Sequence, residues 1–182
     1  MGNVNRCRRF WSPLVWPLLA LGAGGALAEQ VCKYDSIAAT APASRFTDNR
    51  DGTVTDQATG LQWKRCAEGE TSSGGTCAGS LGQHYTWQQA LQRADTASFA
   101  DKDDWRLPNI NELTSIVEEA CYAPAIDLGV FSPTISGRYW SSSPVAYRDG
   151  ADSAWVVDFY WGTGENRSKD YVSDILLVRG RE

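Results

Sequence analysis

The segment from Trp105 to Leu113 constrains the fold of this chain more than any other, because it fixes where one helix must begin. Pro108 ends an extended run, and Asn109 is a side chain suited to cap a helix. Glu112, three positions later, can return a hydrogen bond to the Asn109 amide and complete a capping box. The residues that then recur at helical spacing and should form a buried stripe are Ile110, Leu113, Val117 and Ala120.

A second helix is predicted to begin after Thr86. Thr86 is a favourable N-cap, and Gln89 can act as its reciprocal partner. Apolar residues follow at the spacing that lines one face of a helix. This stripe consists of Trp87, Ala90, Leu91 and Ala94.

Short strands and tight turns account for much of the remaining pattern. The segment 154–161 is largely apolar on both faces, so we expect it to be a central strand. The segment 174–179 is also apolar on both faces and is expected to pair beside it. Two early helices, a late antiparallel sheet and long loops indicate an α+β domain. The other predicted strands are 139–142 and a hairpin of 53–56 with 61–64, preceded by a turn at 49–52.

The first 28 residues are typical of a secretory signal. Arginines precede an apolar run that ends in small residues at the cleavage positions, Ala26 and Ala28. Because this run is shorter than the roughly 20 residues of a spanning helix, we expect cleavage and no membrane span in the mature chain. The remainder divides into a lead-in at 29–44 and one domain at 45–182.

Loss of the signal would make an acidic chain more acidic. It removes three arginines and no acid, which leaves 14 basic and 22 acidic side chains and changes the formal net charge from −5 to −8. This balance argues against nucleic acid as a partner, and against strongly sulfated ligands unless basic residues cluster locally.

Four cysteines remain after the signal, an even number that indicates two disulfides in an exported chain. Three pairings are possible. Cys66 and Cys77 flank a loop rich in Gly, Ser and Thr that a short bridge would close, which leaves Cys32 with Cys121 at the expected end of the second helix. A zinc site is the competing interpretation, but the chain has a single histidine and no Cys-x-x-Cys motif.

Six ordered motifs connect the sequence to a known family. Trp105-Arg106-Leu107-Pro108 followed by Glu112-Leu113 resembles the W-R-L-P-x-x-x-E-L signature of the Lcl C-terminal domain family, named for the terminal domain of a bacterial collagen-like adhesin. The resemblance covers about residues 45–181. It implies a C-type-lectin-like fold, in a superfamily that includes the formylglycine-generating-enzyme fold, with ligands bound by the long loops. The other motifs lie at 52–63, 86–91, 139–142, 154–159 and 178–179.

Calcium is the metal that the sequence suggests most readily, since oxygen-bearing side chains crowd the turn at 48–56. Alignment of Gly52 with the glycine of an EF-hand places Thr47 and Ala58 where Asp and Glu are needed. We therefore expect no metal and no cofactor, with a looser calcium site as the alternative.

Catalytic patterns are weak. His84 has no evident nucleophile beside it, and the serines at 141–143 lack a G-x-S-x-G elbow. Glu112 and Asp158 would form a glycosidase pair only at a suitable spacing, which the sequence does not give. We expect no enzyme activity.

Arg106 and Arg179 flank apolar segments and are expected to pair with Asp104, Glu112 or Asp158. The signature residues Trp105, Arg106, Leu107, Pro108 and Glu112 are accordingly interpreted as structural. Ligand binding is expected in two polar loops, 147–152 and 162–171, whose glycines, mixed charges and flanking aromatics suit polar recognition. The candidate residues are Tyr147, Arg148, Asp149, Asp152, Trp161, Glu165, Asn166, Arg167 and Tyr171.

We interpret the chain as an exported, non-catalytic binding domain in the periplasm, at the cell surface or outside a bacterium. The resemblance to the adhesin domain implies adhesion or recognition of a glycan or another polar ligand. A protein–protein interaction module of a surface assembly is the alternative, followed by a carbohydrate-active enzyme. The oligomeric state stays open, because the chain has no Gly-X-Y tract that would impose a trimer.

Overall fold

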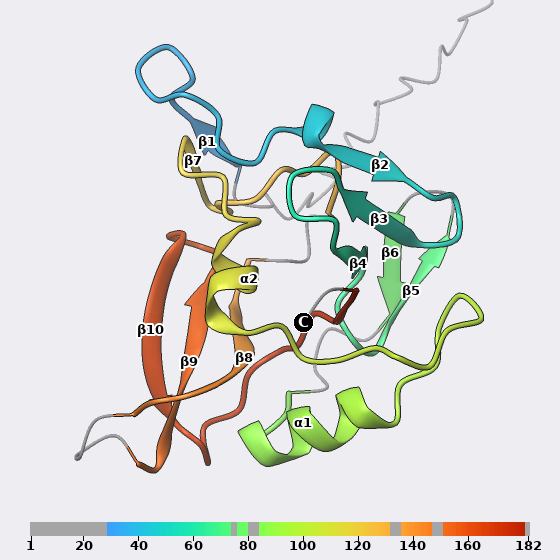
Figure 1. Ribbon diagram of the computed structural model, residues 1–182. Coiled ribbons are helices and arrows are strands. Elements are labelled where there is room, and N and C mark those ends of the chain that lie inside the picture. Colours follow the sequence, from blue (N-terminus) through green and yellow to red (C-terminus); the bar gives the residue numbers. More distant parts are fainter. Residues whose placement is uncertain (1–28, 74–75, 80–83, 132–135, 147–150, 181–182) are drawn as a thin grey trace, which may run out of the picture.

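The computed structural model describes residues 29–73, 76–79, 84–131, 136–146 and 151–180 (Figure 1). Its helices are α1 (Trp87–Asp95), α2 (Ile110–Thr114) and a short 3-10 helix, η1 (Ala43–Arg45). The strands are β1 (Val31–Cys32), β2 (Phe46–Asp48), β3 (Thr53–Asp56), β4 (Gln62–Lys64), β5 (Glu70–Ser73), β6 (Thr76–Gly79), β7 (Cys121–Tyr122), β8 (Arg138–Pro144), β9 (Ser153–Asp158), β10 (Thr163–Ser168) and β11 (Val178–Arg179).

These strands form four small antiparallel sheets within the described residues, where the sequence predicted one late sheet. The largest has the order β11-β4-β3-β2 and contains the predicted hairpin of β3 and β4. A three-stranded sheet has the order β10-β9-β8, so β9 is central, as its apolar faces indicated. The pairs β1-β7 and β5-β6 are two-stranded ribbons. Helices with antiparallel sheets agree with the α+β prediction.

Two apolar clusters form the core, one on each face of the β8–β9 sheet. Val157 and Phe159 pack with Leu113 of α2 in the first cluster. Val156 packs with Ala90 of α1 in the second. The C-terminal segment contributes to both, since Leu176 and Val178 join the first cluster and Ile175 and Leu177 the second. This is why the sequence is apolar on both faces there.

Helix α2 is shorter than predicted. The stripe residues Val117 and Ala120 are buried as expected, but the helix ends at Thr114. The Ser115 hydroxyl donates to the carbonyl of Glu112, and the Glu118 amide donates to Ala125 instead of continuing the helix. The buried Glu118 carboxylate accepts hydrogen bonds from three backbone amides, so tertiary contacts set this boundary. Cys121 therefore lies in β7 and not at a helix end.

The last strand does not pair beside β9. Val178 and Arg179 pair with Trp63 and Gln62 of β4, in the other sheet. Just before them, Asp174 bridges to Tyr139 of β8. The segment thus connects the two sheets, which the apolar pattern alone could not distinguish from a neighbour of β9.

The predicted loop 162–171 is also different, because Thr163–Ser168 forms the edge strand β10. Gly162, at φ +73°, makes the tight turn that begins it, with its amide bonded to the Asp158 carbonyl at 2.8 Å. A Cβ added to Gly162 would lie 2.9 Å from the Cβ of Ala125, so the turn packs directly on the core. Gly162, one of the glycines that suggested flexibility, therefore fixes the turn of a hairpin.

Two disulfides join Cys32 to Cys121 and Cys66 to Cys77, the pairing expected from the sequence. Such bonds are characteristic of oxidising compartments. Within the described residues, no helix has the length and apolar character required to cross a membrane. The proposed signal at 1–28 lies outside the described residues.

Candidate functional site

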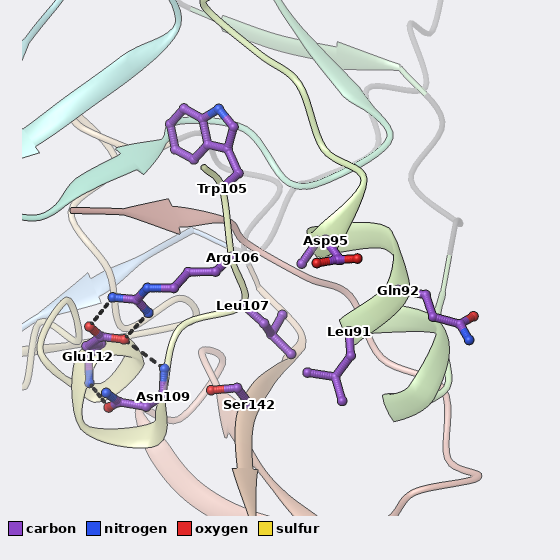
Figure 2. A pocket seen from close by; sticks show the side chains of 10 residues that line it. Leu91, Gln92, Asp95, Trp105, Arg106, Leu107, Asn109, Glu112 and Ser142 are labelled. Carbon is purple, nitrogen blue, oxygen red and sulfur yellow. Dashed lines mark hydrogen bonds and ion pairs between the residues drawn. The ribbon is translucent and has the colours of Figure 1, made fainter. Parts of the chain in front are cut away.

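A pocket of about 770 Å³ lies between α1 and the segment that leads into α2 (Figure 2). This volume is in the range of small-ligand sites. Leu91 and Leu107 face each other across it, and the buried Ala94 and Trp105 complete its apolar part. The polar lining consists of Gln92, Asp95, Arg106, Asn109, Glu112 and Ser142.

The walls of the pocket are fixed by capping and by strand contacts. Helix α1 begins with the predicted capping box, in which Thr86 and Gln89 bond reciprocally. The indole of Trp87 donates to the Ser141 carbonyl of β8 at 2.8 Å, which docks the helix on the sheet. On the opposite wall, the Arg106 backbone exchanges hydrogen bonds of 2.9 and 3.0 Å with Val178. The pocket is thus held by rigid elements.

Arg106 and Glu112 form a closed pair in this wall. Two guanidinium nitrogens of Arg106 each donate to one oxygen of Glu112 at 2.7 Å. The same carboxylate accepts from the Asn109 amide, completing the predicted capping box. Burial raises the pKa of Glu112, but the bonds from Arg106 and the Asn109 amide outweigh it and lower the pKa overall. The carboxylate therefore stays ionised and committed to Arg106.

Asp95 is the charged group of the pocket that has no such partner. Within the described residues, its exposed carboxylate makes no hydrogen bond or ion pair. It is the last residue of α1, where the negative end of the helix dipole disfavours an acid. The Ser142 hydroxyl, which has no protein partner in the described part of the chain, lies on the β8 side of the same pocket.

A comparison with family models identifies the family of this domain. The model of the Lcl C-terminal domain matches residues 52–179, which include both walls of the pocket. The chain belongs to the Lcl C-terminal domain family. A search of curated proteins gave no match.

In this Lcl C-terminal domain, those expected ligand-binding residues that the structure describes do not line a common cavity. Tyr147, Arg148 and Asp149 lie outside the described residues. Asp152 is exposed at the start of β9 and its carbonyl accepts the Lys169 amide at 2.7 Å.

The other expected ligand residues follow the outer edge of the three-stranded sheet. Glu165 pairs with Arg167 on the same strand and lies 3.3 Å from Arg138. Arg167 is placed over the ring of Tyr171 at 5.9 Å. Trp161, 59% exposed, stacks at 6.1 Å on Tyr122, a residue that the sequence did not single out.

The remaining titratable candidates of the domain are paired. Arg179 binds Asp104 at 2.6 Å, one of the partners expected for it. Asp158 binds Arg138 at 3.0 Å, so it and Glu112 are held by different arginines. His84 contacts Asp174 at 3.0 Å. The pKa of Asp174 is raised by burial, and His84 offsets this only in part.

In the acidic turn before β3, carboxylate oxygens accept hydrogen bonds from groups of the turn itself. Asp48 accepts from the Arg50 amide at 2.7 Å, and Asp51 accepts from the amide and hydroxyl of Thr53. Among the described residues, no group of three or more His, Cys, Asp or Glu side chains is placed to hold a metal ion.

Sequence reasoning missed Asp95 and Ser142 as candidates. The signal for Asp95 was present, because an acid in the last turn of a predicted helix opposes the helix dipole and contributes nothing to stability there. Ser142 belongs to a motif that resembles the family, but only the folded chain brings it beside the signature, where its amide donates to the Pro108 carbonyl at 2.8 Å.

Proposed function

We propose that this chain is an exported, non-catalytic recognition domain that binds an uncharged or basic saccharide in the pocket between α1 and residues 105–112. The observation that carries the proposal is a pair of facing apolar side chains, Leu91 and Leu107, bordered by Asp95 and Ser142, whose side chains bind no other described residue. Sugars present both apolar C–H faces and hydroxyl groups, so such a mixed lining suits them.

The charge of the pocket defines the class of saccharide. Arg106 is neutralised by Glu112, which leaves Asp95 as the uncompensated charge. A carboxylate accepts hydrogen bonds from hydroxyl or ammonium groups and repels sulfate and carboxylate groups. The acidic net charge of the chain, −5, acts in the same direction. Neutral and amino sugars are therefore the preferred ligands.

A binding role is favoured over catalysis because the carboxylates near the pocket do not form an acid–base pair. Glu112 is locked by Arg106 with a lowered pKa, whereas a general acid requires a raised one. Export through the segment 1–28, a C-type-lectin-like fold and a site of action in the periplasm or at the cell surface complete the proposal. The signal pattern and the two disulfides support export and this location, and the ordered sequence motifs support the fold.

The test is an array of uncharged, amino-bearing and sulfated oligosaccharides, probed with the purified protein in the presence and absence of EDTA. We expect binding to uncharged or amino-bearing members that is unchanged by EDTA. Binding restricted to sulfated members would contradict the charge argument. Absence of binding to every member would contradict a saccharide ligand.

Two substitutions localise the site. Asp95→Asn and Ser142→Val should each weaken binding of the best array ligand, Asp95→Asn by about tenfold or more if a charge-assisted hydrogen bond is lost. Asp35→Asn is the matched control, because Asp35 is an exposed carboxylate that does not line the pocket. Equal effects of Asp35→Asn and Asp95→Asn would indicate a general charge effect and remove the pocket from the proposal.

A further inference from the structure

Strand β10 has no strand along its outer edge among the described residues, and Figure 1 shows it as the outermost element of its sheet. Its pairing with β9 is regular from Thr163 to Ser168, without a bulge. The opposite edge of the same sheet is different, because β8 has a register shift before Pro144. Bulges and prolines prevent edge-to-edge pairing. β8 has both and β10 has neither.

The backbone of β10 has a defined outward set of hydrogen-bonding groups. The Lys169 amide donates to the Asp152 carbonyl in the same register as the β9–β10 ladder, which identifies alternate residues as bonded to β9. Residues 163, 165 and 167 therefore direct their amides and carbonyls toward β9. The amides and carbonyls of 164, 166 and 168 point away from the sheet, where the Arg167 guanidinium of the same chain donates to the Asn166 carbonyl at 3.3 Å.

The charged side chains of β10 match those of a second, antiparallel copy of β10 in one register. If a second copy pairs with residue 166 opposite residue 166, Glu165 of each chain lies opposite Arg167 of the other. The outward backbone groups of Gly164 then face those of Ser168 in the other copy. Shifting by two residues places Glu165 opposite Glu165, or Arg167 opposite Arg167. Like charges therefore disfavour both neighbouring registers.

Exposed aromatic side chains lie just beyond both ends of the strand. Trp161, 59% exposed, precedes β10 by two residues, and Tyr171, 41% exposed, follows it by three. Because the strands of a two-fold pair run in opposite directions, Trp161 of one copy comes to the same end of the interface as Tyr171 of the other. Aromatic residues are favoured in such positions because they bury much area.

We propose that β10 is a two-fold interface through which two copies of this chain join their three-stranded sheets into one six-stranded sheet. The occupant is a second copy because the alternation of Glu165 and Arg167 matches itself. This inference is independent of the saccharide pocket, which lies on the α1 side of the domain.

A cysteine pair tests the register. Asn166→Cys places the new thiols opposite each other on the two-fold axis, at about the 5.5 Å Cα separation of a bonded antiparallel pair, within disulfide range. Ser168→Cys is the matched control, because its copy lies four residues along, about 13 Å away. We expect Asn166→Cys to give a covalent dimer on mild oxidation and Ser168→Cys to remain at the wild-type level. Equal crosslinking, or none by Asn166→Cys, would overturn the register.

Charge exchange tests the interface without cysteines. In sedimentation velocity across a concentration series, the wild type should reach twice the mass of one chain. Arg167→Glu should weaken dimerisation by about tenfold or more, because two like-charge contacts replace two favourable ones. The double exchange Glu165→Arg with Arg167→Glu should restore it to within about threefold of the wild type, since the complementary pattern is re-formed.

The outcomes of this experiment are distinct. A wild type that is monomeric at every concentration, a trimer, or a dimer that is indifferent to the charge exchange would each overturn the proposal. Circular dichroism verifies that each variant is folded. Should Arg167→Glu unfold the chain through loss of its own contacts, the cysteine pair decides.

Discussion

Two regions of the domain use an arginine–glutamate pair in opposite ways. Arg106 and Glu112 close a bidentate pair at the start of α2, with side chains 24% and 14% exposed. Glu165 and Arg167 pair on the edge strand β10, where the side chains are 28% and 35% exposed and the sheet ends. In the first pair, both carboxylate oxygens of Glu112 already accept hydrogen bonds, from Arg106 and from the Asn109 amide of the helix cap. The second pair lies on a strand that has no neighbouring strand on its outer side among the described residues, so its side chains are placed to contact a second chain.

The largest expected difference between these regions is in core stability. Trp105→Ala and Leu113→Ala should each lower the free energy of unfolding by about 2–5 kcal/mol, because both side chains are buried beside the signature. Trp161→Ala, at the end of β10, should change it by about 0.5 kcal/mol or less, since most of that ring is exposed. Urea unfolding measures all three. Wild-type midpoints for the first two would exclude the signature from the core.

The second-largest expected difference is in the free energy of unfolding lost when the carboxylate of each pair is removed. Glu112→Ala removes two bonds from Arg106 and one from the Asn109 amide, so we expect a loss of about 1–3 kcal/mol. Glu165→Ala also removes an arginine partner, but at a more exposed position, where the loss should stay within about 1 kcal/mol. Equal losses in urea unfolding would show that the two pairs do not differ as described.

Acid should weaken the closed pairs of buried carboxylates, which are Asp56 with Arg45, Glu68 with Lys64 and Arg93, and Glu112 with Arg106. Burial raises the pKa values of Asp56, Glu68 and Glu112, but hydrogen bonds and charges from Arg45, Lys64, Arg93 and Arg106 outweigh burial and lower all three. A lowered folded pKa stabilises the fold above the unfolded pKa of about 4 and loses this contribution as pH falls through the folded value. Asp174, with a raised pKa, acts in the opposite direction.

Urea unfolding between neutral pH and about pH 2 measures this balance, because three lowered groups should dominate one raised group. The expected curve is flat near neutrality and falls below about pH 4. A free energy of unfolding that is constant or rising toward low pH would contradict the proposed role of the closed pairs.

The smallest expected effect is that of Asp95→Asn, a substitution in the pocket that should change stability and ligand binding in opposite directions. Asp95→Asn should raise the free energy of unfolding by about 0.3–1 kcal/mol, because it removes an unpaired acid from the negative end of α1. The same substitution is expected to weaken saccharide binding. A destabilised Asp95→Asn would instead indicate that the carboxylate has a structural partner.

The sequence predicted the locally encoded features well. Both capping boxes are formed where Thr86 and Asn109 indicated, because a cap depends on residues three positions apart. The Cys66–Cys77 disulfide and the β3–β4 hairpin were likewise accessible, since each joins positions close in the sequence, and the Cys32–Cys121 disulfide followed by elimination.

Features that depend on distant partners could not be predicted. Helix α2 ends early because Glu118 bonds to Ala125 and to residues near Thr40. The strand β10 was read as a loop because it is polar on both faces, and only its pairing with β9 makes it an edge. The pocket was missed for the same reason, since Asp95 approaches the signature only when α1 docks on β8, and Ser142 only when β8 bonds to Pro108.

The most direct test of the central claim is a titration of the protein, with ¹⁵N in its tryptophan indoles, with the best-bound saccharide of the array. Trp105 is a buried lining residue of the pocket whose indole donates to the Phe99 carbonyl, and the indole of Trp87 docks α1 on β8, whereas Trp161 marks the β10 edge. Our account predicts shifts for the Trp105 and Trp87 indoles and an unchanged Trp161 signal. A shift confined to Trp161, with Trp105 and Trp87 unchanged, would contradict it and place ligand binding at the sheet edge.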